Sequence, residues 1–581
     1  MPSTAPTPYP AGLRTAVRAL LCMLALLLSA CGSLPSMPAR TASHALPQPQ
    51  STPLGQMVQA QRTAADTPYG SGFVLLGGAD AAFASRLALV EAATQTLDLQ
   101  YYAIHADPST ARLLHAIVQA AQRGVRVRIL LDDFHSAGKN AQIMRMAFVP
   151  GIEMRMFNPL TGPRGSTVIR TLTTLTDFQR AQQRMHNKLF IADNSIGIAG
   201  GRNLGDAYFD ALDSDNFIDL DIMAAGSVVR QLSASFDRYW NDARAYPVSA
   251  LITEKELLHL QSLQEASTPA TSATSATSAT SAAERRIASL PPLNLQAIDW
   301  IWAPALVLAD APSKIPAPPE DTAEAQTTDT ATQALIPHLP DSLSTHSSSP
   351  NRQALRNVLQ PVVQQDNVIN GLLALIDQAQ HDVLIVSPYF VPGKDMKAAF
   401  ARALERGVRL RILTNSLASN DAPLAHAGYA RHRRDLLQMG VQLYELRSVQ
   451  GGKIGVDTLR TATRKITGSQ GHSRAMLHSK MLVLDHKLTV IGSMNLDQRS
   501  QLQNTEIALL VASRQLAGEA TENIEASLRE AAWLLEDTPG GLVWRAPEDS
   551  DWGDQTREPD ASLPLRMMIR IIGPLAPDHL L

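Results

Sequence analysis

The chain has 581 residues, of which 45% are hydrophobic, and its 51 Lys and Arg residues against 54 Asp and Glu give a formal net charge of −3. This length allows several domains with large cores, whereas the near-neutral charge argues against a protein that binds nucleic acid, because phosphate contacts need a basic surface. The two cysteines, Cys22 and Cys31, lie close together near the start, so no disulfide framework is expected.

Residues 1–30 are predicted to be a signal peptide of the lipoprotein type. Arg14 and Arg18 precede an apolar run over 19–30 that is short for a membrane span but suits the core of a secretory signal. The run ends in Leu-Ser-Ala-Cys, which resembles the bacterial lipoprotein cleavage box and implies attachment of lipid to Cys31. A plain signal peptide or a signal anchor is the alternative.

A lipidated Cys31 would anchor the protein to a membrane of the bacterial cell envelope, facing the periplasm. The residue after it is Gly32 rather than Asp. By the usual lipoprotein sorting rule, this favours the outer membrane over the inner one.

Composition divides the remaining chain into five parts. A disordered tether rich in Pro, Ser, Thr and Ala is predicted first, and two α/β halves follow, separated by a low-complexity linker in which a short segment around Trp300 and Trp302 docks on the body. A C-terminal segment comes last. The boundaries are 31–67 for the tether, 68–250 for the first half, 251–350 for the linker, 351–515 for the second half and 516–581 for the C-terminal segment.

The two halves repeat one pattern of elements. A strand, an amphipathic helix and a second strand are expected over 96–102, 110–123 and 125–131, and again over 381–390, 396–406 and 408–414. Strands that alternate with helices predict βαβ units and mixed sheets with helices on their faces. The expected fold is therefore α/β, with two sandwich halves related by a pseudo-two-fold axis.

Both halves carry a His, a Lys two positions later and an Asp five positions after the Lys. We predict that all six side chains are catalytic, namely His186, Lys188 and Asp193 in the first copy and His478, Lys480 and Asp485 in the second. In a strand, alternate side chains share a face, so the His and Lys of each copy should point to one place. Two copies in register indicate one shared active site at the seam between the halves.

Each copy is followed by a turn of small residues that ends in Asn. Gly201 and Asn203 in the first half, and Ser493 and Asn495 in the second, are predicted to bind a phosphate group. Further along, Asp219 and Glu506 occupy equivalent places. Either carboxylate could hydrogen-bond the far ring nitrogen of a motif histidine and fix its tautomer, or it could be an acid at the end of a surface strand.

Two histidines and two lysines at one axis suit displacement at a phosphodiester. One imidazole attacks phosphorus to form a phosphohistidine, the other protonates the leaving alkoxide, and the ammonium groups stabilise the charge of the transition state. The paired motif, with its Gly/Ser-x-Asn sequel, resembles that of the phospholipase D superfamily. The resemblance implies an enzyme without metal or cofactor in which His186 is the nucleophile and His478 the acid, although the symmetry of the motifs leaves this order open.

Within that superfamily, the stretch Ser-Pro-Tyr-Phe-Val-Pro-Gly at 387–393 and the region 414–446 resemble bacterial cardiolipin synthases of the C type. This implies a membrane-anchored phosphatidyltransferase that makes cardiolipin from two phospholipids. Its partners would be phosphatidylglycerol, with phosphatidylethanolamine as a further candidate, and a membrane, without nucleic acid or an obligatory oligomer. The alternatives are a hydrolase that releases phosphatidic acid, a phosphodiesterase or nuclease, and a non-catalytic envelope scaffold.

Overall fold

The computed structural model describes residues 34–35, 40–162, 164, 177–210, 216–267, 282–316, 360–448, 475–548 and 550–580. The predicted signal peptide and Cys31 lie outside the described residues, as does nearly all of the Thr-Ser-Ala repeat. Within the described parts of the chain, no helix combines the length and the apolar content needed to cross a membrane.

The first half is built on a sheet of nine strands in the order β10-β1-β8-β6-β5-β2-β3-β4-β9. Its strands are β1 (Ser71–Leu76), β2 (Thr96–Tyr101), β3 (Arg126–Asp132), β4 (Ile152–Phe157), β5 (Leu189–Ala192), β6 (Ile196–Gly200), β8 (Asp221–Gly226), β9 (Ala245–Pro247) and β10 (Ile301–Trp302). Only β2, β3 and β4 pair in parallel here, and the other pairs are antiparallel. The sheet is therefore mixed, as the sequence predicts.

The second half repeats this arrangement in the order β11-β20-β18-β17-β12-β14-β15-β21-β22. Its strands are β11 (Ala305–Ala309), β12 (Asp382–Val386), β14 (Arg409–Asn415), β15 (Gln442–Leu446), β17 (Met481–Leu484), β18 (Leu488–Gly492), β20 (Ile507–Ala512), β21 (Ala532–Thr538) and β22 (Gly541–Arg545). From β11 to β15 the order matches that from β1 to β4, with parallel pairing again confined to β12, β14 and β15. The predicted α/β fold with two related halves is confirmed.

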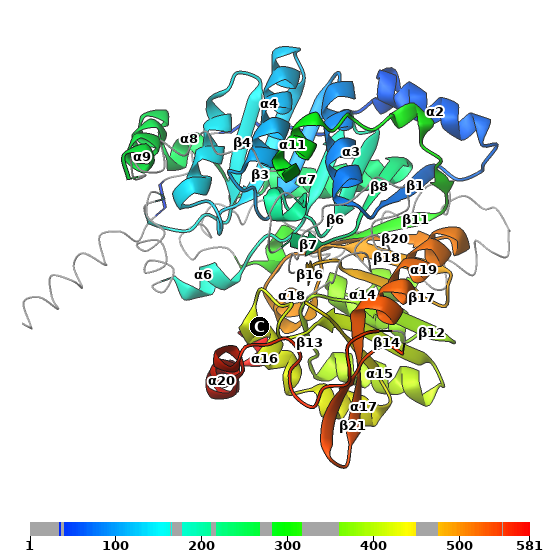
Figure 1. The fold of residues 1–581 in the computed structure, drawn as a ribbon. Helices are drawn as coiled ribbons and strands as arrows, with labels where there is room; N and C mark the ends of the chain where they lie inside the picture. The colour runs from blue at the N-terminus through cyan, green and yellow to red at the C-terminus, as the bar shows by residue number, and fades with distance from the viewer. Residues whose placement is uncertain are drawn as a thin grey trace, which may run out of the picture.

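Helices form three apolar layers with the sheets. On the outer face of the first sheet lie α3 (Ala79–Ala92) and α4 (Pro108–Gln122), and on that of the second lie α14 (Val368–Ile376) and α15 (Lys394–Glu405). Between the sheets, α7 (Ser227–Asn241) and α19 (Arg514–Ala531) join one core with strands of both halves. Figure 1 shows the first half, coloured mostly blue to green, above the second, coloured mostly yellow-green to red. The seam is thus a continuous hydrophobic core.

Two predicted boundaries are wrong. Part of the predicted linker forms sheet, because β10 extends the first sheet beside β1 and β11 is the edge strand of the second sheet beside β20. The second half therefore begins well before residue 351. It also continues past residue 515, since α19 packs in the seam core and β21 and β22 extend the second sheet.

The predicted disordered tether is also wrong over its described part. Residues 53–64 form helix α2 (Pro53–Ala64), whose preceding Thr52 caps it by accepting a hydrogen bond from the Gly55 amide. Leu54 and Val58 of this helix are buried in the core of the first half. Upstream, the Ser43 amide donates to Asn241 at 3.1 Å. Apolar contacts and hydrogen bonds thus hold residues 40–64 on the first half, although their composition is typical of a tether.

Candidate active site

One short strand pairing and one isolated bridge, between Met185 and Thr505, cross the seam and place the motif histidines. Strand β7 (Asn216–Ile218) of the first half pairs in parallel with β16 (Ala475–Leu477) of the second. The His478 amide donates to the Ile218 carbonyl at 2.8 Å, and the His186 amide donates to the Thr505 carbonyl at 2.9 Å. Each histidine therefore follows a residue that pairs with the other half, directly opposite the predicted acid.

Each motif histidine binds the carboxylate of the opposite half. His478 Nδ1 lies 2.6 Å from Asp219 Oδ2, and His186 Nδ1 lies 3.0 Å from Glu506 Oε2. All four side chains are nearly or fully buried. Because Nδ1 is engaged in both rings, Nε2 is the nitrogen that remains for substrate.

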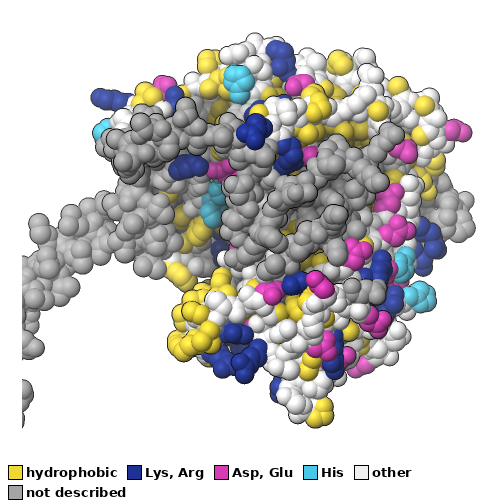
Figure 2. Space-filling view, in the orientation of Figure 1, with side chains coloured by type: hydrophobic (Ala, Val, Ile, Leu, Met, Phe, Trp, Pro, Cys, Tyr) yellow, Lys and Arg dark blue, Asp and Glu magenta, His cyan; other side chains and the backbone are white. Residues whose placement is uncertain are grey.

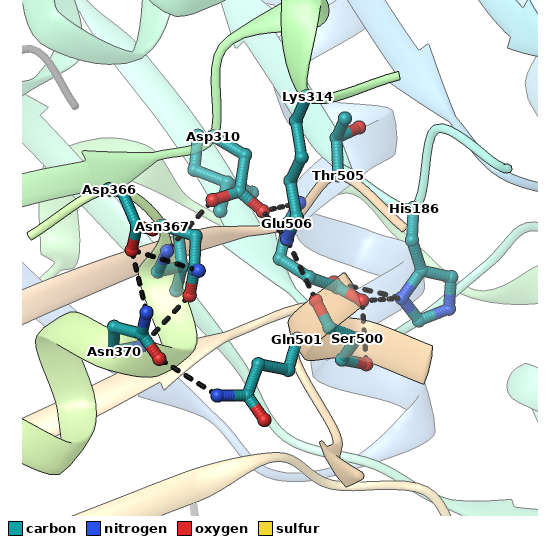
Figure 3. A network of polar contacts seen from close by, with 12 residues as sticks. His186, Asp310, Lys314, Asp366, Asn367, Asn370, Ser500, Gln501, Thr505 and Glu506 are labelled. Carbon is teal, nitrogen blue, oxygen red and sulfur yellow. Dashed lines mark hydrogen bonds and ion pairs between the residues drawn. The ribbon is translucent and has the colours of Figure 1, made fainter. Parts of the chain in front are cut away.

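Further polar contacts position Glu506. Its carboxylate accepts hydrogen bonds from the hydroxyls of Ser493 at 2.5 Å and Ser500 at 2.9 Å, as well as contacting His186. Its amide donates to Asp310 Oδ2 at 2.9 Å, and the same oxygen accepts from Lys314. Figure 3 shows this network running from His186 through Glu506 to Asp310.

The support of Asp219 is different. Its Oδ1 accepts a hydrogen bond from the Leu220 amide at 2.9 Å, and its backbone carbonyl accepts one from Arg202 at 2.5 Å. A Cβ at Gly201 would lie 2.8 Å from Asp219 Oδ1 and 3.0 Å from the His478 carbonyl oxygen. Gly201 therefore allows the two halves to approach closely at this carboxylate.

The pKa values of the two carboxylates are shifted in opposite directions. Burial raises the pKa of Glu506 to about 7, against the attraction of Lys188. Burial also acts to raise the pKa of Asp219, but His478, Lys480 and Arg202 outweigh it, so this pKa lies below its ordinary value. For both histidines, burial and the nearby lysines lower the pKa, and for His186 the lowering is large. Asp219 is thus the stronger support for a charged imidazole.

The motif lysines lie within the same buried cluster. Lys188 Nζ donates to the His186 carbonyl at 2.7 Å, and Lys480 Nζ donates to the His478 carbonyl at 2.5 Å. Burial lowers the pKa of Lys188 to about 7 and that of Lys480 to about 8, although Glu506 and Asp219 oppose this effect. The motif residues do not lie within the strands as predicted, because β5 begins at Leu189 and β17 at Met481. Instead, the residues directly before the two histidines, Met185 and Leu477, pair with the opposite half.

A cavity of about 570 Å³ opens at the seam and receives side chains from both halves. Its polar and aromatic lining includes His186, Asn203, His478, Asn495, Arg499, Asn504, Asp421, Tyr102, Tyr208 and Tyr389. Tyr102 lies edge-on to His186 at 5.0 Å and Tyr208 edge-on to His478 at 5.3 Å, measured between ring centroids. In the described parts of the chain, no group of three or more His, Cys, Asp and Glu side chains is placed to hold a metal ion.

The predicted catalytic role of Asp193 and Asp485 is not supported by their positions. The Asp193 carboxylate accepts hydrogen bonds from the amides of Thr94, Gln95 and Thr96, where the chain enters β2. Asp485 accepts from three consecutive amides, 380 to 382, where the chain enters β12. Neither belongs to the cavity lining drawn from the described residues. Both side chains instead hold the turn that starts a central strand.

The predicted phosphate-binding residues separate into two pairs. Asn203 and Asn495 line the cavity, and Asn495 Oδ1 is buried without a hydrogen-bond partner among the described residues. Gly201 and Ser493 are not part of the lining; a Cβ at Gly201 would collide with Asp219, and the Ser493 hydroxyl donates to Glu506. The assignment of Gly201 and Ser493 to phosphate therefore stays a prediction that this geometry does not support.

Sequence reasoning missed several cavity residues. Arg499 brings a guanidinium into the cavity, and Asp421 accepts a hydrogen bond from the Tyr389 hydroxyl at 2.7 Å. Ser500, which supports Glu506, follows Arg499 directly. The signal for Arg499 in the sequence is its position, four residues after Asn495. The first half has Ala207 at the equivalent position, so the repeat does not mark Arg499 as a site residue.

Comparison with known proteins agrees with this geometry. The family described as "Cardiolipin synthase, PLD-like domain" matches residues 87–240 and 372–528. "Cardiolipin synthase C" of Escherichia coli (strain K12) is 34% identical over 504 residues, covering 86% of this chain and 94% of the relative. An uncharacterized protein of Helicobacter pylori is 31% identical, covering 90% of this chain and 91% of its own length.

A solved structure shares the fold. The crystal structure of phosphatidylserine synthase from Haemophilus influenzae Rd KW20 superimposes with a TM-score of 0.50 at 13% identity, covering 90% of this chain and 100% of that one. At this identity the similarity concerns the fold alone.

Proposed function

The chain belongs to the phospholipase D superfamily as an enzyme of the cardiolipin synthase kind, and we propose on this premise that it makes cardiolipin by moving a phosphatidyl group between two phospholipids. The observation that carries the proposal is the pair of buried histidines, each held at Nδ1 by a carboxylate of the opposite half and both lining one cavity. This arrangement provides a nucleophile and an acid on two sides of one phosphodiester.

In the first step, Nε2 of His186 attacks phosphorus of the donor lipid. The bond between phosphorus and the head-group oxygen breaks, and His478 gives its Nε2 proton to that leaving oxygen. In the second step, His478 takes a proton from a hydroxyl of the acceptor phosphatidylglycerol, whose oxygen attacks phosphorus and releases His186. A phosphodiester is broken and another is formed, and both histidines return to their starting states.

The proposed roles of the two histidines, as nucleophile and general acid, rest on the carboxylates that contact them. Asp219, with a lowered pKa and a 2.6 Å contact, favours the proton on His478 that a general acid needs. The much lower pKa of His186 favours a neutral ring with a lone pair on Nε2. We therefore assign His186 as the nucleophile and His478 as the acid.

The charge that develops on the phosphate oxygens needs buried donors. Lys188 and Lys480 supply positive charge beside the histidines, Arg499 offers a guanidinium in the cavity, and Asn203 and Asn495 line its wall. Donors held in place before the reaction stabilise the transition state without reorganisation at the moment of reaction.

The test supplies purified protein with defined phospholipids and identifies the products by mass spectrometry. Cardiolipin together with the released head-group alcohol, either glycerol or ethanolamine, supports transfer and also names the donor lipid. Phosphatidic acid without cardiolipin would mean that water resolves the phosphohistidine and would replace transfer with hydrolysis. No turnover of any phospholipid would contradict the proposal.

We further propose that the protein is anchored in the bacterial cell envelope through lipid on Cys31, facing the periplasm and favouring the outer membrane. The support is the sequence around Cys31 and Gly32. Such an anchor would keep the cavity beside its lipid substrates.

A further inference from the structure

The C-terminal helix α20 (Leu563–Ile572) carries an exposed apolar row. Eleven large apolar side chains are exposed among the described residues, and six of them lie within 563–575. They are Leu563, Met567, Met568, Ile571, Ile572 and Leu575. Leu563, Met567 and Ile571 are spaced four residues apart and so share one side of the helix, and Leu575 lies in the 3-10 helix that follows it. Figure 2 shows an apolar cluster at the position that α20 occupies in Figure 1, with basic side chains beside it.

The opposite side of this helix is attached to the body. Leu565 and Ile569 pack against buried Leu417 and Ala418. Beyond the helix, Arg431 donates to the carbonyls of Gly573 at 2.6 Å and Ala576 at 2.9 Å. The helix is therefore held in place while its outer apolar row has no partner within the described chain.

The exposed row lies beside the mouth of the active-site cavity. Helix α20 contacts α16 (Pro423–Ala430), whose Leu424 and Ala425 line the cavity, and Leu580 after α20 lines it as well. Three more exposed apolar side chains lie in the cavity lining or next to residues of the lining. Leu424 is in the lining, Leu502 ends the helix that carries Arg499, and Phe134 precedes His135 of the lining.

We propose that α20 docks the cavity mouth onto the surface of an anionic phospholipid bilayer. The apolar row enters the acyl region, and Arg566 and Arg570, which alternate with it along the helix, bind lipid phosphates. The acidic residues on either side of the helix are already paired, Asp560 with Arg447 and Asp578 with Arg431 and His432. A bilayer fits this face better than a protein partner, since a protein here would cover the mouth that must admit a lipid head group. This choice of occupant rests on the proposed function.

A probe on the helix itself tests the docking without depending on catalysis. Ile571→Cys is made in a full-length chain carrying Cys22→Ser and Cys31→Ser, and a nitroxide label is attached. On vesicles of phosphatidylglycerol and phosphatidylethanolamine, the label should become accessible to oxygen and protected from a water-soluble relaxation agent. Leu258→Cys on α9 (Glu254–Ser267), also exposed, is the matched control and should stay in water.

The labelling results distinguish a bilayer from a second copy of the chain on the exposed face of α20. A label at 571 that stays as water-accessible as the label at 258 would overturn the proposal, whatever else holds the chain on the vesicle. Protection at 571 that develops without vesicles as the protein concentration rises would also overturn it, because a second copy would then cover the helix. Protection on anionic vesicles that weakens on phosphatidylcholine vesicles supports it.

Kinetics give the second test and distinguish this proposal from the proposed function. Met567→Glu with Ile571→Glu should lower turnover of vesicle lipids by about tenfold or more, because charges on the row prevent insertion. Turnover of a monomeric short-chain phospholipid should stay within about twofold, as it should for the control Leu258→Glu on both substrates. Equal losses on both substrates would overturn the docking proposal. Absence of turnover on either substrate in the unmodified protein would instead contradict the proposed function, while the label at 571 would still decide the docking.

Discussion

His478 Nδ1 lies 2.6 Å from Oδ2 of Asp219, a residue contributed by the other half of the chain. The counterpart contact of His186 with Glu506 is longer, at 3.0 Å, and Glu506 also accepts hydrogen bonds from two serine hydroxyls. A short contact with an ionised carboxylate stabilises an imidazolium. The repeated motif thus gives two histidines with unequal environments, and the proposed roles of nucleophile and acid are based on this inequality.

The leaving group should reveal which histidine is the acid. In His478→Ala, a lipid whose head group is p-nitrophenol needs no protonation, so the protein should release one p-nitrophenolate per active site at a rate within about tenfold of the unmodified enzyme. The same variant should lose about a thousandfold or more on natural phospholipids. Rapid-mixing absorbance measures the burst.

His186→Ala is the matched variant in that experiment. It lacks the nucleophile and should show no burst with either substrate. A burst from His186→Ala and none from His478→Ala would reverse the assignment.

The pH dependence of kcat/KM should be bell-shaped with its maximum between about 7 and 8. Below pH 7, the Glu506 carboxyl is protonated and donates a hydrogen bond to His186 Nδ1. The proton of the neutral ring is then on Nε2, which has no lone pair for the attack. On the alkaline side, Lys188 loses its proton through about pH 7 and Lys480 through about pH 8, so the positive charge beside the phosphate is removed in two steps. Activity should therefore rise through about pH 7, where Glu506 ionises, and fall through about pH 8.

Glu506→Gln checks the acidic limb. The amide oxygen can still accept a hydrogen bond from His186, but the group no longer titrates. The rise near pH 7 should disappear while some activity remains. If the variant keeps the same rise at a uniformly lower rate, Glu506 has a structural role only.

Asp193→Ala should affect stability far more than catalysis. Its carboxylate is buried and accepts hydrogen bonds from three backbone amides and the Thr94 hydroxyl, so its removal should cost about 3 kcal/mol. The midpoint of thermal unfolding should fall, and kcat should stay within about threefold at temperatures where the variant is folded. An unchanged midpoint with a hundredfold loss of kcat would restore the catalytic assignment.

Cys31→Ser should change how the protein is held on membranes. A lipid anchor survives extraction with alkaline carbonate, whereas a chain held only by the surface helix α20 should be extracted. Membrane fractions from cells that express each form are washed with carbonate and compared. A Cys31→Ser protein that resists extraction as the unmodified protein does would refute lipidation, and mass spectrometry of the first mature residue checks the result.

Local patterns allowed the sequence to predict the central elements. The predicted strand over 96–102, helix over 110–123 and strand over 125–131 correspond to β2, α4 and β3, because alternation and amphipathic spacing are properties of neighbouring residues. The two motif histidines could be placed at the seam because the motif occurs twice. Their meeting in one cavity follows from the repeated fold.

Long-range pairing accounts for most of what the sequence did not predict. Neither the crossing of Asp219 and Glu506 to the opposite histidines nor the pairing of β11 with β20 is visible in a linear pattern, because both depend on contacts between distant segments. Residues 40–64 were misread since their Pro, Ser, Thr and Ala content hides the apolar contacts of Leu54 and Val58.

Trapping the covalent intermediate tests the central assignment most directly. His478→Ala protein is mixed with the p-nitrophenyl lipid, quenched and digested under alkaline conditions that preserve phosphohistidine, and the peptides are identified by mass spectrometry. We predict a phosphatidyl adduct on His186 and none on any peptide of the His186→Ala protein. An adduct on His478 in the His186→Ala protein, with none on His186 in the reciprocal variant, would contradict it.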